Sequence, residues 1–483
     1  MMNVSFKPKA SYVGDAIPYY EDGKYFIYYL DDPRSKEKGI YAEETTWGLL
    51  ESEDGVEYSD KGRVLPLGNS NTPYLNNYTG SVIKGKDNLY YAFFTAFNAE
   101  NEKYVVDGKA VQSVMVARGE SKDHLEIIEN SRFIGDNRIY EIYDWRDPYV
   151  FYNEEEDNYW MLLCSRVKGT GYHRGGCIAL CKSKDLLTWT YEKPFYEPNM
   201  YITMECPEVF RMGSWWYLVF STFSDRFMTH YRKSKSLEGP WIIPYEDTLD
   251  CRCDYAIKTA GDSQERLAFG WIPTKLGRND GGPWEWGGTL IAHRLLHDEE
   301  SGDLKVSIIP EEEKRFKKKI EKSFGYLVNS QYRNNELYSE GLGAALYRNE
   351  SKTFLIKAKV KTEAQEFGLF LGTDETLENG YQLRVSRGII SLDKWPRFEK
   401  GEEGIYQWQI KGDVPFLAET IRYYVPGTTE FDLKIIRDEE VLIVYINDSM
   451  VMSTRIYRKD SGLDGIYVIG GKLEISSFEY SEQ

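Results

Sequence analysis

Three acidic residues precede stretches of the sequence that are typical of β-strands, and each could take part in nucleophilic or acid–base chemistry. They are Asp15, Asp147 and Glu205. After each comes an aromatic and apolar run, a polar turn and a second such run. Cleaving a glycosidic bond with retention requires a carboxylate nucleophile and a second carboxyl group that first donates and then accepts a proton. The three residues are therefore candidate catalytic residues.

The residue types suggest how the roles are divided. Asp15 is short and readily ionised, as suits a nucleophile. Glu205 is longer and suits the acid/base, because burial beside another carboxylate raises a pKa toward the working pH. Arg146 precedes Asp147 and would keep it ionised, so Asp147 is better suited to binding sugar hydroxyls. Retention also requires that the carboxyl groups of Asp15 and Glu205 stand about 5–5.5 Å apart.

A repeated strand–turn–strand unit indicates how carboxylates so distant in the sequence could meet. Its five copies open near Asp15, Ser81, Asp147, Glu205 and Tyr255. Two hairpins per repeat make a four-stranded sheet, and five such sheets arranged radially make a five-bladed β-propeller. The opening strands would be innermost, so the residues before them would converge on the centre. A β-sandwich with coincidental spacing is the alternative.

The pattern changes after about residue 310. Residues 311–323 are charged and compatible with a helix, and from about Gly325 short apolar strands alternate with polar turns. This alternation predicts an antiparallel β-sandwich. We therefore predict an all-β chain with a propeller catalytic domain over residues 1–312, a linker over 313–325 and a β-sandwich over 326–483.

The composition excludes several classes of partner. The net charge of −17 argues against nucleic acid and anionic membranes, which it would repel. Aromatic residues make up 15% of the chain, which suits a β-rich protein that binds sugar rings. No apolar run is long enough to span a bilayer, and residues 1–10 lack the apolar core of a signal peptide. We expect a cytoplasmic protein that acts on a small-molecule or oligosaccharide substrate; the sequence does not indicate its oligomeric state.

The cysteines do not suggest a metal site. All six lie between residues 164 and 253, and they show no zinc-ligand spacing. With only five His in the chain, we expect no metal and no cofactor. Free, buried thiols in a reducing compartment are the expected state.

Two motifs give the sequence a specific resemblance. Trp145-Arg146-Asp147-Pro148 resembles the Arg-Asp-Pro motif of glycoside hydrolase family 32, the β-fructofuranosidases, and Met204-Glu205-Cys206-Pro207 resembles its Glu-Cys-Pro motif. Thr46-Trp47-Gly48, Gly80-Ser81 and Asp254-Tyr255-Ala256 are similar to further segments of the family. The resemblance spans residues 10–312, and the family's second domain is a β-sandwich.

The resemblance implies a role for each matching residue. Asp15 would be the nucleophile, Asp147 the transition-state stabiliser and Glu205 the acid/base. The remaining residues that it places in substrate binding are Arg146, Trp47, Ser81 and Tyr255. Trp284 and Trp286, in an aromatic loop, could form a platform for the leaving group, or the loop could be a packing corner between blades.

The sequence also departs from the family's pattern near the proposed nucleophile. Gly14 replaces the usual Asn, Leu30 replaces the Gln at the end of the next strand, and Leu49 replaces the His of the Trp-Gly-His segment. These changes leave the reaction class standing and put sucrose, the usual substrate, in doubt. The alternatives to a β-fructosidase are a fructosyltransferase, a pentose-cleaving propeller glycosidase and a non-catalytic sugar-binding protein.

Overall fold

The fold is built almost entirely of β-strands, as the sequence predicts. The computed structural model describes residues 5–34, 44–386, 388–396, 417–422, 427–457 and 462–483. Among them, helical structure is confined to α1 (Pro310–Glu313) and the 3-10 turns η1 (Glu102–Tyr104) and η2 (Leu276–Arg278). Within these ranges no helix is both long enough and apolar enough to cross a lipid bilayer.

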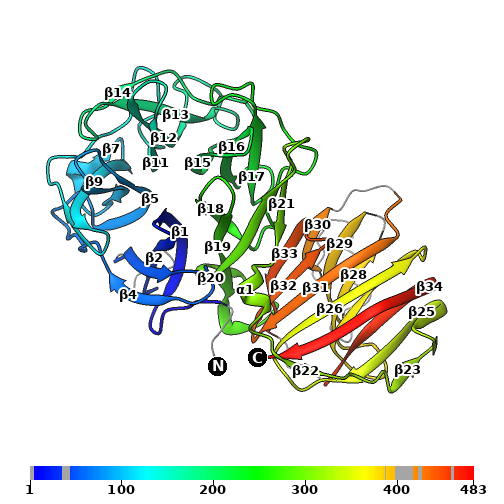
Figure 1. The fold of residues 1–483 in the computed structure, drawn as a ribbon. Coiled ribbons are helices and arrows are strands. Elements are labelled where there is room, and N and C mark those ends of the chain that lie inside the picture. The colour runs from blue at the N-terminus through cyan, green and yellow to red at the C-terminus, as the bar shows by residue number, and fades with distance from the viewer. Residues whose placement is uncertain (1–4, 35–43, 387, 397–416, 423–426, 458–461) are drawn as a thin grey trace. The chain divides into compact units, whose positions relative to one another are not determined.

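The chain divides into two compact units (Figure 1). The first contains residues 5–273 and 285–305, and the second contains residues 274–284 and the described residues from 306 to 483. The sequence therefore crosses between the units more than once, and the segment 274–284 belongs to the second unit although both of its neighbours belong to the first.

Four larger antiparallel sheets make up the first unit. An eight-stranded sheet contains β1 (Tyr12–Glu21), β2 (Lys24–Asp32), β3 (Thr46–Ser52), β4 (Ser59–Arg63), β18 (Tyr255–Gly261), β19 (Arg266–Lys275), β20 (Trp284–His297) and β21 (Leu304–Ser307). A four-stranded sheet contains β5 (Asn76–Lys84), β6 (Tyr90–Phe97), β9 (Ser113–Ser121) and β10 (His124–Ile127). Another contains β11 (Arg146–Asn153), β12 (Asn158–Arg166), β13 (Gly176–Ser183) and β14 (Thr190–Tyr191). A three-stranded sheet contains β15 (Glu205–Met212), β16 (Trp215–Thr222) and β17 (Met228–Ser234), and β7 (Val105–Val106) pairs with β8 (Lys109–Ala110).

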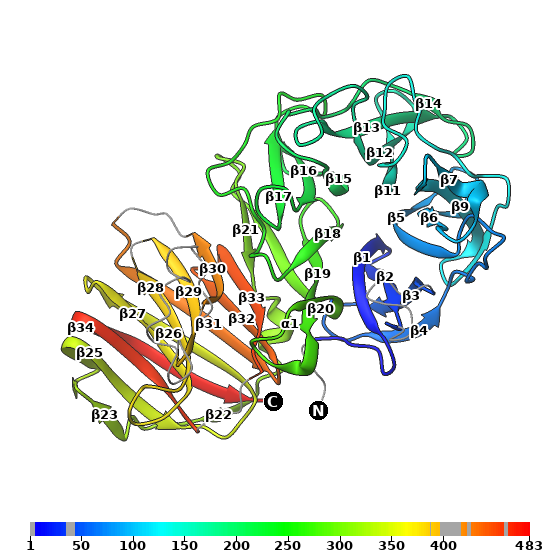
Figure 2. The same cartoon turned by 180° about the vertical axis from the view of Figure 1, so that it is seen from behind.

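Five strands of these sheets face a common centre. They are β1, β5, β11, β15 and β18, and both views of the ribbon show them around one central region (Figures 1 and 2). Each contacts the next, and β18 contacts β1 again, so the five inner strands form a closed circle. Apolar clusters pack between neighbouring sheets and fix their spacing; Trp47, Trp145 and Phe220 are fully buried in them.

Every inner strand is irregular near its start. The pairing register is broken between Val13 and Ala16, Tyr78 and Gly80, Arg146 and Tyr149, Glu205 and Glu208, and Tyr255 and Lys258. In three of these bulges one residue is left-handed, with φ of 57° at Asp147, 50° at Cys206 and 57° at Ala256. A β-bulge turns side chains away from the regular alternation. The residues in the bulges can therefore point toward the central region.

The second unit is a single antiparallel network of strands. Its members are β22 (Lys318–Ile320), β23 (Tyr326–Val328), β24 (Gln331–Arg333), β25 (Glu336–Arg348), β26 (Thr353–Thr362), β27 (Glu366–Thr373), β28 (Gly380–Ser386), β29 (Ile389–Trp395), β30 (Leu417–Arg422), β31 (Glu430–Asp438), β32 (Val441–Ile446), β33 (Met450–Arg455) and β34 (Leu463–Glu482). The 20-residue β34 pairs with β25 and β27 through its first half and with β22 and β26 through its second half.

The charged segment after residue 310 differs from the expected helix-compatible linker. Only Pro310–Glu313 is helical, and β22 (Lys318–Ile320) pairs with the last residues of β34. Lys318 and Lys319 pair with Glu482 and Glu479 on that strand. Tertiary pairing with an available strand edge therefore decides the structure of this segment, whose composition alone permits a helix.

A buried ion network supports the outer strand β17. Arg232 is fully buried; its Nη1 donates to Asp247 Oδ2 at 2.7 Å and its Nη2 donates to the Tyr201 hydroxyl at 2.7 Å. His230 Nδ1 lies 3.0 Å from the same oxygen of Asp247. Burial by itself raises the pKa of Asp247, but His230 and Arg232 outweigh it and hold the pKa below its ordinary value.

We expect Asp247→Asn to destabilise the fold by roughly 3–5 kcal/mol at neutral pH, because it leaves the buried Arg232 without its counter-charge. A carboxyl group whose folded-state pKa is lowered contributes stability above its unfolded pKa, which is about 3.9, and loses it as the pH falls. The difference in the free energy of unfolding between wild type and Asp247→Asn, measured by urea unfolding, should therefore become smaller below about pH 4. Asp157→Asn, at the exposed ion pair with Lys86, is the control and should leave the free energy of unfolding nearly unchanged, because exposed ion pairs contribute little.

Candidate functional site

A pocket of about 460 Å³ opens where the inner strands begin. It is lined by the bulge residues of the five strands and by neighbouring side chains: Asp15, Leu30, Asp32, Thr45, Tyr78, Thr79, Phe97, Gln112, Arg146, Asp147, Glu205, Cys206, Tyr255 and Trp286. The structure thus brings together all three carboxylates singled out from the sequence, with Arg146, Tyr255 and Trp286 beside them.

Asp15 is held by donors from three other strands. The indole Nε1 of Trp271 donates to its Oδ1 at 3.0 Å, and the Thr79 hydroxyl donates to its Oδ2. Cys206 Sγ lies 3.7 Å from the same Oδ2. These donors come from β19, β5 and β15, so the position of the carboxylate depends on three different sheets.

Asp147 is more deeply buried and is fixed through both its backbone and its side chain. Its N–H donates to the Thr95 hydroxyl at 2.8 Å, which supports the left-handed backbone at this position. Its Oδ2 accepts from the Cys206 N–H at 3.0 Å and lies 3.9 Å from Arg146 Nε. The bulge of β15 is therefore bonded directly to the bulge of β11.

Glu205 has a different kind of environment, with one donor on each oxygen. Arg146 Nη2 donates to Oε1 at 3.0 Å, and the Tyr255 hydroxyl donates to Oε2 at 2.7 Å. Arg146 also donates through Nη1 to Asp144 Oδ1 at 2.8 Å and to Gln112 Oε1 at 3.3 Å. The guanidinium thus bridges the Glu205 side of the pocket and the polar groups of the segment before β11.

The carboxylates influence one another because they are close and poorly solvated. Burial, followed by repulsion from Glu205, raises the pKa of Asp15 above its ordinary value, although the Thr79 and Trp271 donors oppose the shift. Burial is also the largest influence on Asp147, and it raises the pKa to about 7 even though Arg146 opposes it. Burial likewise raises the pKa of Asp32, which lines the same pocket, so at least three of its carboxyl groups hold protons more tightly than in water.

Two residues that the sequence placed in the pocket lie elsewhere. Trp47 is fully buried in the core; its ring packs against Tyr28, with ring centroids 5.7 Å apart, and its Nε1 donates to the Tyr78 carbonyl at 3.0 Å. Ser81 lies beyond the bulge of β5, where its hydroxyl accepts from the Val150 N–H at 2.9 Å and lines a smaller hollow of about 230 Å³. Both lie outside the group of residues that lines the larger pocket.

The aromatic loop divides between the two units. Trp286 lines the pocket of the first unit, and its ring lies 5.5 Å from that of Trp271. Trp284 belongs to the second unit, where its ring is 37% exposed and Lys275 Nζ lies 4.3 Å from the ring centroid.

Sequence reasoning missed several residues that shape the pocket. Thr79 and Trp271 bind the carboxylate of Asp15, and Gln112 and Asp144 bind Arg146. Thr79 directly precedes the Gly80-Ser81 segment, so the register break of β5 determines which of these neighbours reaches the pocket. Nothing in the residue types of Trp271 and Gln112 marks them before the strands are placed.

One buried cluster has the donor types that hold a metal ion. Asp250, Asp254 and His293 offer ligand atoms within 4.8 Å of one another, and His293 Nε2 lies 3.4 Å from Asp250 and 3.5 Å from Asp254. Burial alone would lower the pKa of His293, but the two carboxylates raise it to about 9. The imidazolium itself therefore supplies positive charge between the carboxylates.

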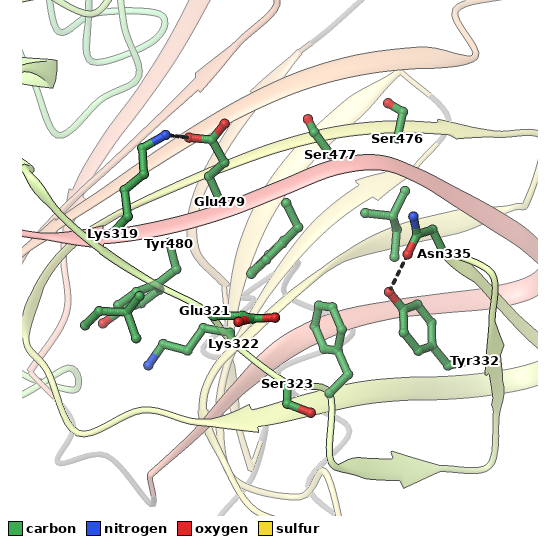
Figure 3. Close-up of a pocket in the computed structure, with 14 residues that line it drawn as sticks. Lys319, Glu321, Lys322, Ser323, Tyr332, Asn335, Ser476, Ser477, Glu479 and Tyr480 are labelled. Carbon is green, nitrogen blue, oxygen red and sulfur yellow. Dashed lines mark hydrogen bonds and ion pairs between the residues drawn. The ribbon is translucent and has the colours of Figure 1, made fainter.

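A second hollow, of about 720 Å³, lies in the other unit between the segment that includes β22 and the end of β34 (Figure 3). Its side chains interact mainly with one another. Lys319 pairs with Glu479 at 3.1 Å, and the ring of Phe324 packs edge-on against those of Tyr332 and Phe478, with both centroids 5.2 Å away. These contacts account for the side chains as packing, whereas the first pocket gathers charged groups from separate strands.

Comparison with known proteins is consistent across both units. Residues 6–304 match the Glycosyl hydrolases family 32 N-terminal domain, and residues 321–482 match the Glycosyl hydrolases family 32 C terminal domain. A levanase of Bacillus subtilis (strain 168) is 25% identical over 218 residues, which is 43% of this chain and 28% of the levanase. The matched segment thus spans less than a third of that levanase.

Solved structures of the same fold cover the whole chain. Sucrose-6-phosphate hydrolase from Lactobacillus gasseri superposes with a TM-score of 0.74 at 16% identity, covering 100% of this chain and 93% of that one. Exo-inulinase from Aspergillus awamori superposes with a TM-score of 0.72 at 14% identity, covering 100% of this chain and 98% of that one. Fructan 1-exohydrolase IIa from Cichorium intybus superposes with a TM-score of 0.73 at 13% identity, covering 100% of this chain and 97% of that one. With both of its domains matched, the chain belongs to glycoside hydrolase family 32.

Proposed function

We propose that this protein hydrolyses β-fructofuranosidic bonds with retention, through a covalent fructosyl–enzyme intermediate. Asp15 is the nucleophile, Glu205 the acid/base and Asp147 the transition-state stabiliser, with Arg146, Tyr255 and Trp286 in substrate binding. The observation that carries the proposal is the convergence of the three carboxylates, from three separate strands, on one pocket beside Arg146. Membership of family 32 supports the same reaction.

The architecture that we infer is a five-bladed β-propeller over residues 1–312, a linker over 313–325 and a β-sandwich over 326–483. The closed circle of five inner strands supports five blades. The eight-stranded sheet then corresponds to two blades, β1–β4 and β18–β21, joined where Val13 pairs with Gly288. Four sheets thereby account for five blades.

In the first step, an oxygen of Asp15 attacks the anomeric carbon of the fructosyl group. The bond between the anomeric carbon and the leaving-group oxygen breaks, and Glu205 donates its proton to that oxygen. In the second step Glu205 removes a proton from water, which attacks the same carbon and releases Asp15 as a carboxylate. Thr79 and Trp271 occupy one site on each oxygen of Asp15, so they fix its orientation while leaving a lone pair for attack.

Asp147 and Arg146 act on the sugar rather than on the breaking bond. Asp147 is held on the pocket wall by the Cys206 N–H and is the carboxylate best placed to accept hydrogen bonds from fructose hydroxyls. Such bonds strengthen as positive charge develops on the ring in the transition state. Arg146 contributes donors to the same region while it neutralises part of the carboxylate charge.

The substrate class that we propose is sucrose-like fructosides and fructo-oligosaccharides. Structurally similar proteins include enzymes described as acting on sucrose-6-phosphate and on fructan, and one was solved with 1-kestose. A cytoplasmic location is supported by the six cysteines, which are buried and, in the described part of the chain, are not joined in disulfides. Wild-type protein should release fructose when it is assayed with sucrose and with inulin- and levan-type oligosaccharides, and product analysis separates hydrolysis from transfer.

Glu205→Gln should slow both steps, because general acid–base assistance is worth roughly 10²–10⁴-fold. A fructoside with a very good leaving group needs little protonation, so it should restore the first step in Glu205→Gln. Added azide should then accelerate turnover of this variant, since azide attacks the intermediate without a base. The measurement is the rate of leaving-group release with and without azide.

Asp15→Asn is the matched variant, because it also replaces a carboxylate by an amide of the same shape. It should remain inactive with the activated substrate and with azide, since it has no nucleophile. Equal turnover by Asp15→Asn and wild type would exclude Asp15 as the nucleophile. Sugar binding without turnover in the wild type would point to a binding protein instead.

The pH dependence should reveal the coupling between the carboxylates. Asp15 must be ionised to attack, so activity falls as the pH falls through its pKa. Because the charge of Glu205 raises the pKa of both Asp15 and Asp147, Glu205→Gln should move the acid limb of kcat/KM to lower pH. Wild type and Glu205→Gln are compared with the activated substrate. An acid limb of kcat/KM at the same pH in both proteins would show that the charge of Glu205 does not influence Asp15.

Cys206 is predicted to support the site without taking part in the chemistry. It is buried and reduced, and its backbone N–H rather than its thiol makes the short contact to Asp147. Cys206→Ser should therefore retain measurable activity, and the native wild type should show no rapidly reacting thiol toward a disulfide reagent. A folded Cys206→Ser variant with no activity would contradict this role.

A further inference from the structure

The backbone beside Asp15 is in unusually close contact with an aromatic ring. A Cβ atom at Gly14 would lie 2.2 Å from Cη2 of Trp286 and 2.7 Å from its Cζ2. Gly14 is not among the residues with positive φ, so its lack of a side chain is not explained by backbone conformation. What requires glycine here is the indole, which occupies the volume that a side chain at position 14 would fill.

Trp286 also packs against Trp271, whose indole donates a hydrogen bond to Asp15. Its ring lies 5.5 Å from that of Trp271, whose Nε1 donates to Asp15 Oδ1 at 3.0 Å. Trp286 is half-buried and lines the pocket with Asp15 and Leu30. The indole of Trp286 is therefore part of the pocket wall next to the proposed nucleophile. It lies against both Gly14, which precedes Asp15, and Trp271, which donates to Asp15.

A single arginine fixes the backbone that carries this tryptophan. Arg34 Nε donates to the Trp286 carbonyl at 2.9 Å, its Nη2 donates to the Gly287 carbonyl at 2.6 Å, and its Nη1 pairs with Glu285 at 3.0 Å. The guanidinium also lies 3.6 Å from the centroid of the Tyr12 ring. Arg34 thus joins the start of β1 to three consecutive residues of β20.

Arg34 is itself attached to the pocket. Its N–H donates to Asp32 Oδ1 at 2.9 Å, and Asp32, which is 1% exposed, lines the same pocket. The side chain of Arg34 is only 11% exposed. A buried, fully directional guanidinium of this kind holds backbone carbonyls in one geometry, which a flexible lysine does not.

We propose that Trp286 replaces the side chain missing at Gly14 as a specificity-determining wall of the pocket, and that Arg34 is its positioning residue. The inference rests on the proposed function. An indole face binds the C–H face of a sugar ring and excludes water, whereas the Asn of the family pattern would offer hydrogen bonds. The wall therefore selects for substrate groups that present an apolar ring face beside Asp15.

The shared volume can be tested with Gly14→Asn, Trp286→Ala and the double variant. Gly14→Asn should lower the Tm and reduce kcat/KM by about 100-fold or more, because the indole must move and displaces its neighbours. Relative to Gly14→Asn alone, the double variant should have a kcat/KM at least about tenfold higher and a Tm closer to that of the wild type. No recovery of the Tm in the double variant would overturn the shared volume.

Gly23→Asn is the matched control. It lies in the turn of the same hairpin, and a Cβ there would meet nothing within 4 Å. Its φ of 77° is also one that Asn tolerates. The control should retain activity and should gain nothing when combined with Trp286→Ala; an equal loss in Gly14→Asn and Gly23→Asn would count against the proposal.

Arg34 is tested by non-additivity. Arg34→Met should raise KM by roughly five- to tenfold with kcat changed less than about twofold, and it should add no further increase in Trp286→Ala. Arg34→Lys should recover little, since it cannot reach three acceptors at once. Equal effects of Arg34→Met with and without Trp286 would show that Arg34 does not act through this ring.

Fructose binding separates failure of this inference from failure of the proposed function. Fructose should raise the Tm of the wild type, and the rise should be smaller in Trp286→Ala. If fructose binds but no fructoside is cleaved, the proposed reaction fails and the wall stands. If fructose protects both proteins equally, the wall is overturned whatever the activity.

Discussion

The site depends on holding four carboxylates, those of Asp15, Asp32, Asp147 and Glu205, in one pocket that has a single arginine side chain among its lining residues. Like charges gathered in one pocket repel strongly when water is scarce, and burial adds to the cost of ionisation. The raised pKa values of Asp15 and Asp147 express that cost. Arg146, which pairs with both Asp147 and Glu205, offsets it only in part. The rest of the pocket has to resist this repulsion mechanically.

The resistance comes from the irregular starts of the inner strands. All five have a register break, and Asp15, Thr79, Asp147, Glu205 and Tyr255 lie at or beside these breaks. A left-handed non-glycine residue costs about 1–3 kcal/mol, so it persists only where neighbours determine it. The bonds between bulges provide that support, as when the Cys206 N–H binds Asp147. Regular strands around the bulges supply the rigid frame, and their core packing keeps the bulges in register.

The sequence was sufficient to predict the β-strands and the positions of the three carboxylates near strand starts, because both follow from short-range signals. Alternating apolar residues indicate strands, and an acidic residue before a Pro-led strand marks the strand's start. It did not predict on which side of the sheet Ser81 lies, because Ser81 follows the register break of β5. Alternation tells which residues share a face, but a bulge shifts the alternation by one, and a bulge cannot be read from residue types. The contacts of Trp271 and Arg34 join residues more than 200 positions apart and have no local signal.

The same limit applies to the departures from the family pattern, which look equivalent in the sequence and are not equivalent in the structure. Leu49 is 1% exposed in the core cluster, behind the pocket wall, so its replacement of a histidine alters packing rather than substrate contacts. Gly14 and Leu30 both bear on the pocket, one by admitting Trp286 and the other by lining it directly. Two amides of the family pattern are thus replaced, at one wall, by an indole and an aliphatic side chain. Rejection of a wrong substrate is strongest where buried polar groups must be satisfied. On our proposal, this wall would therefore discriminate by shape and C–H contact, and recognition by hydrogen bonding would be concentrated on the side of Asp147 and Arg146.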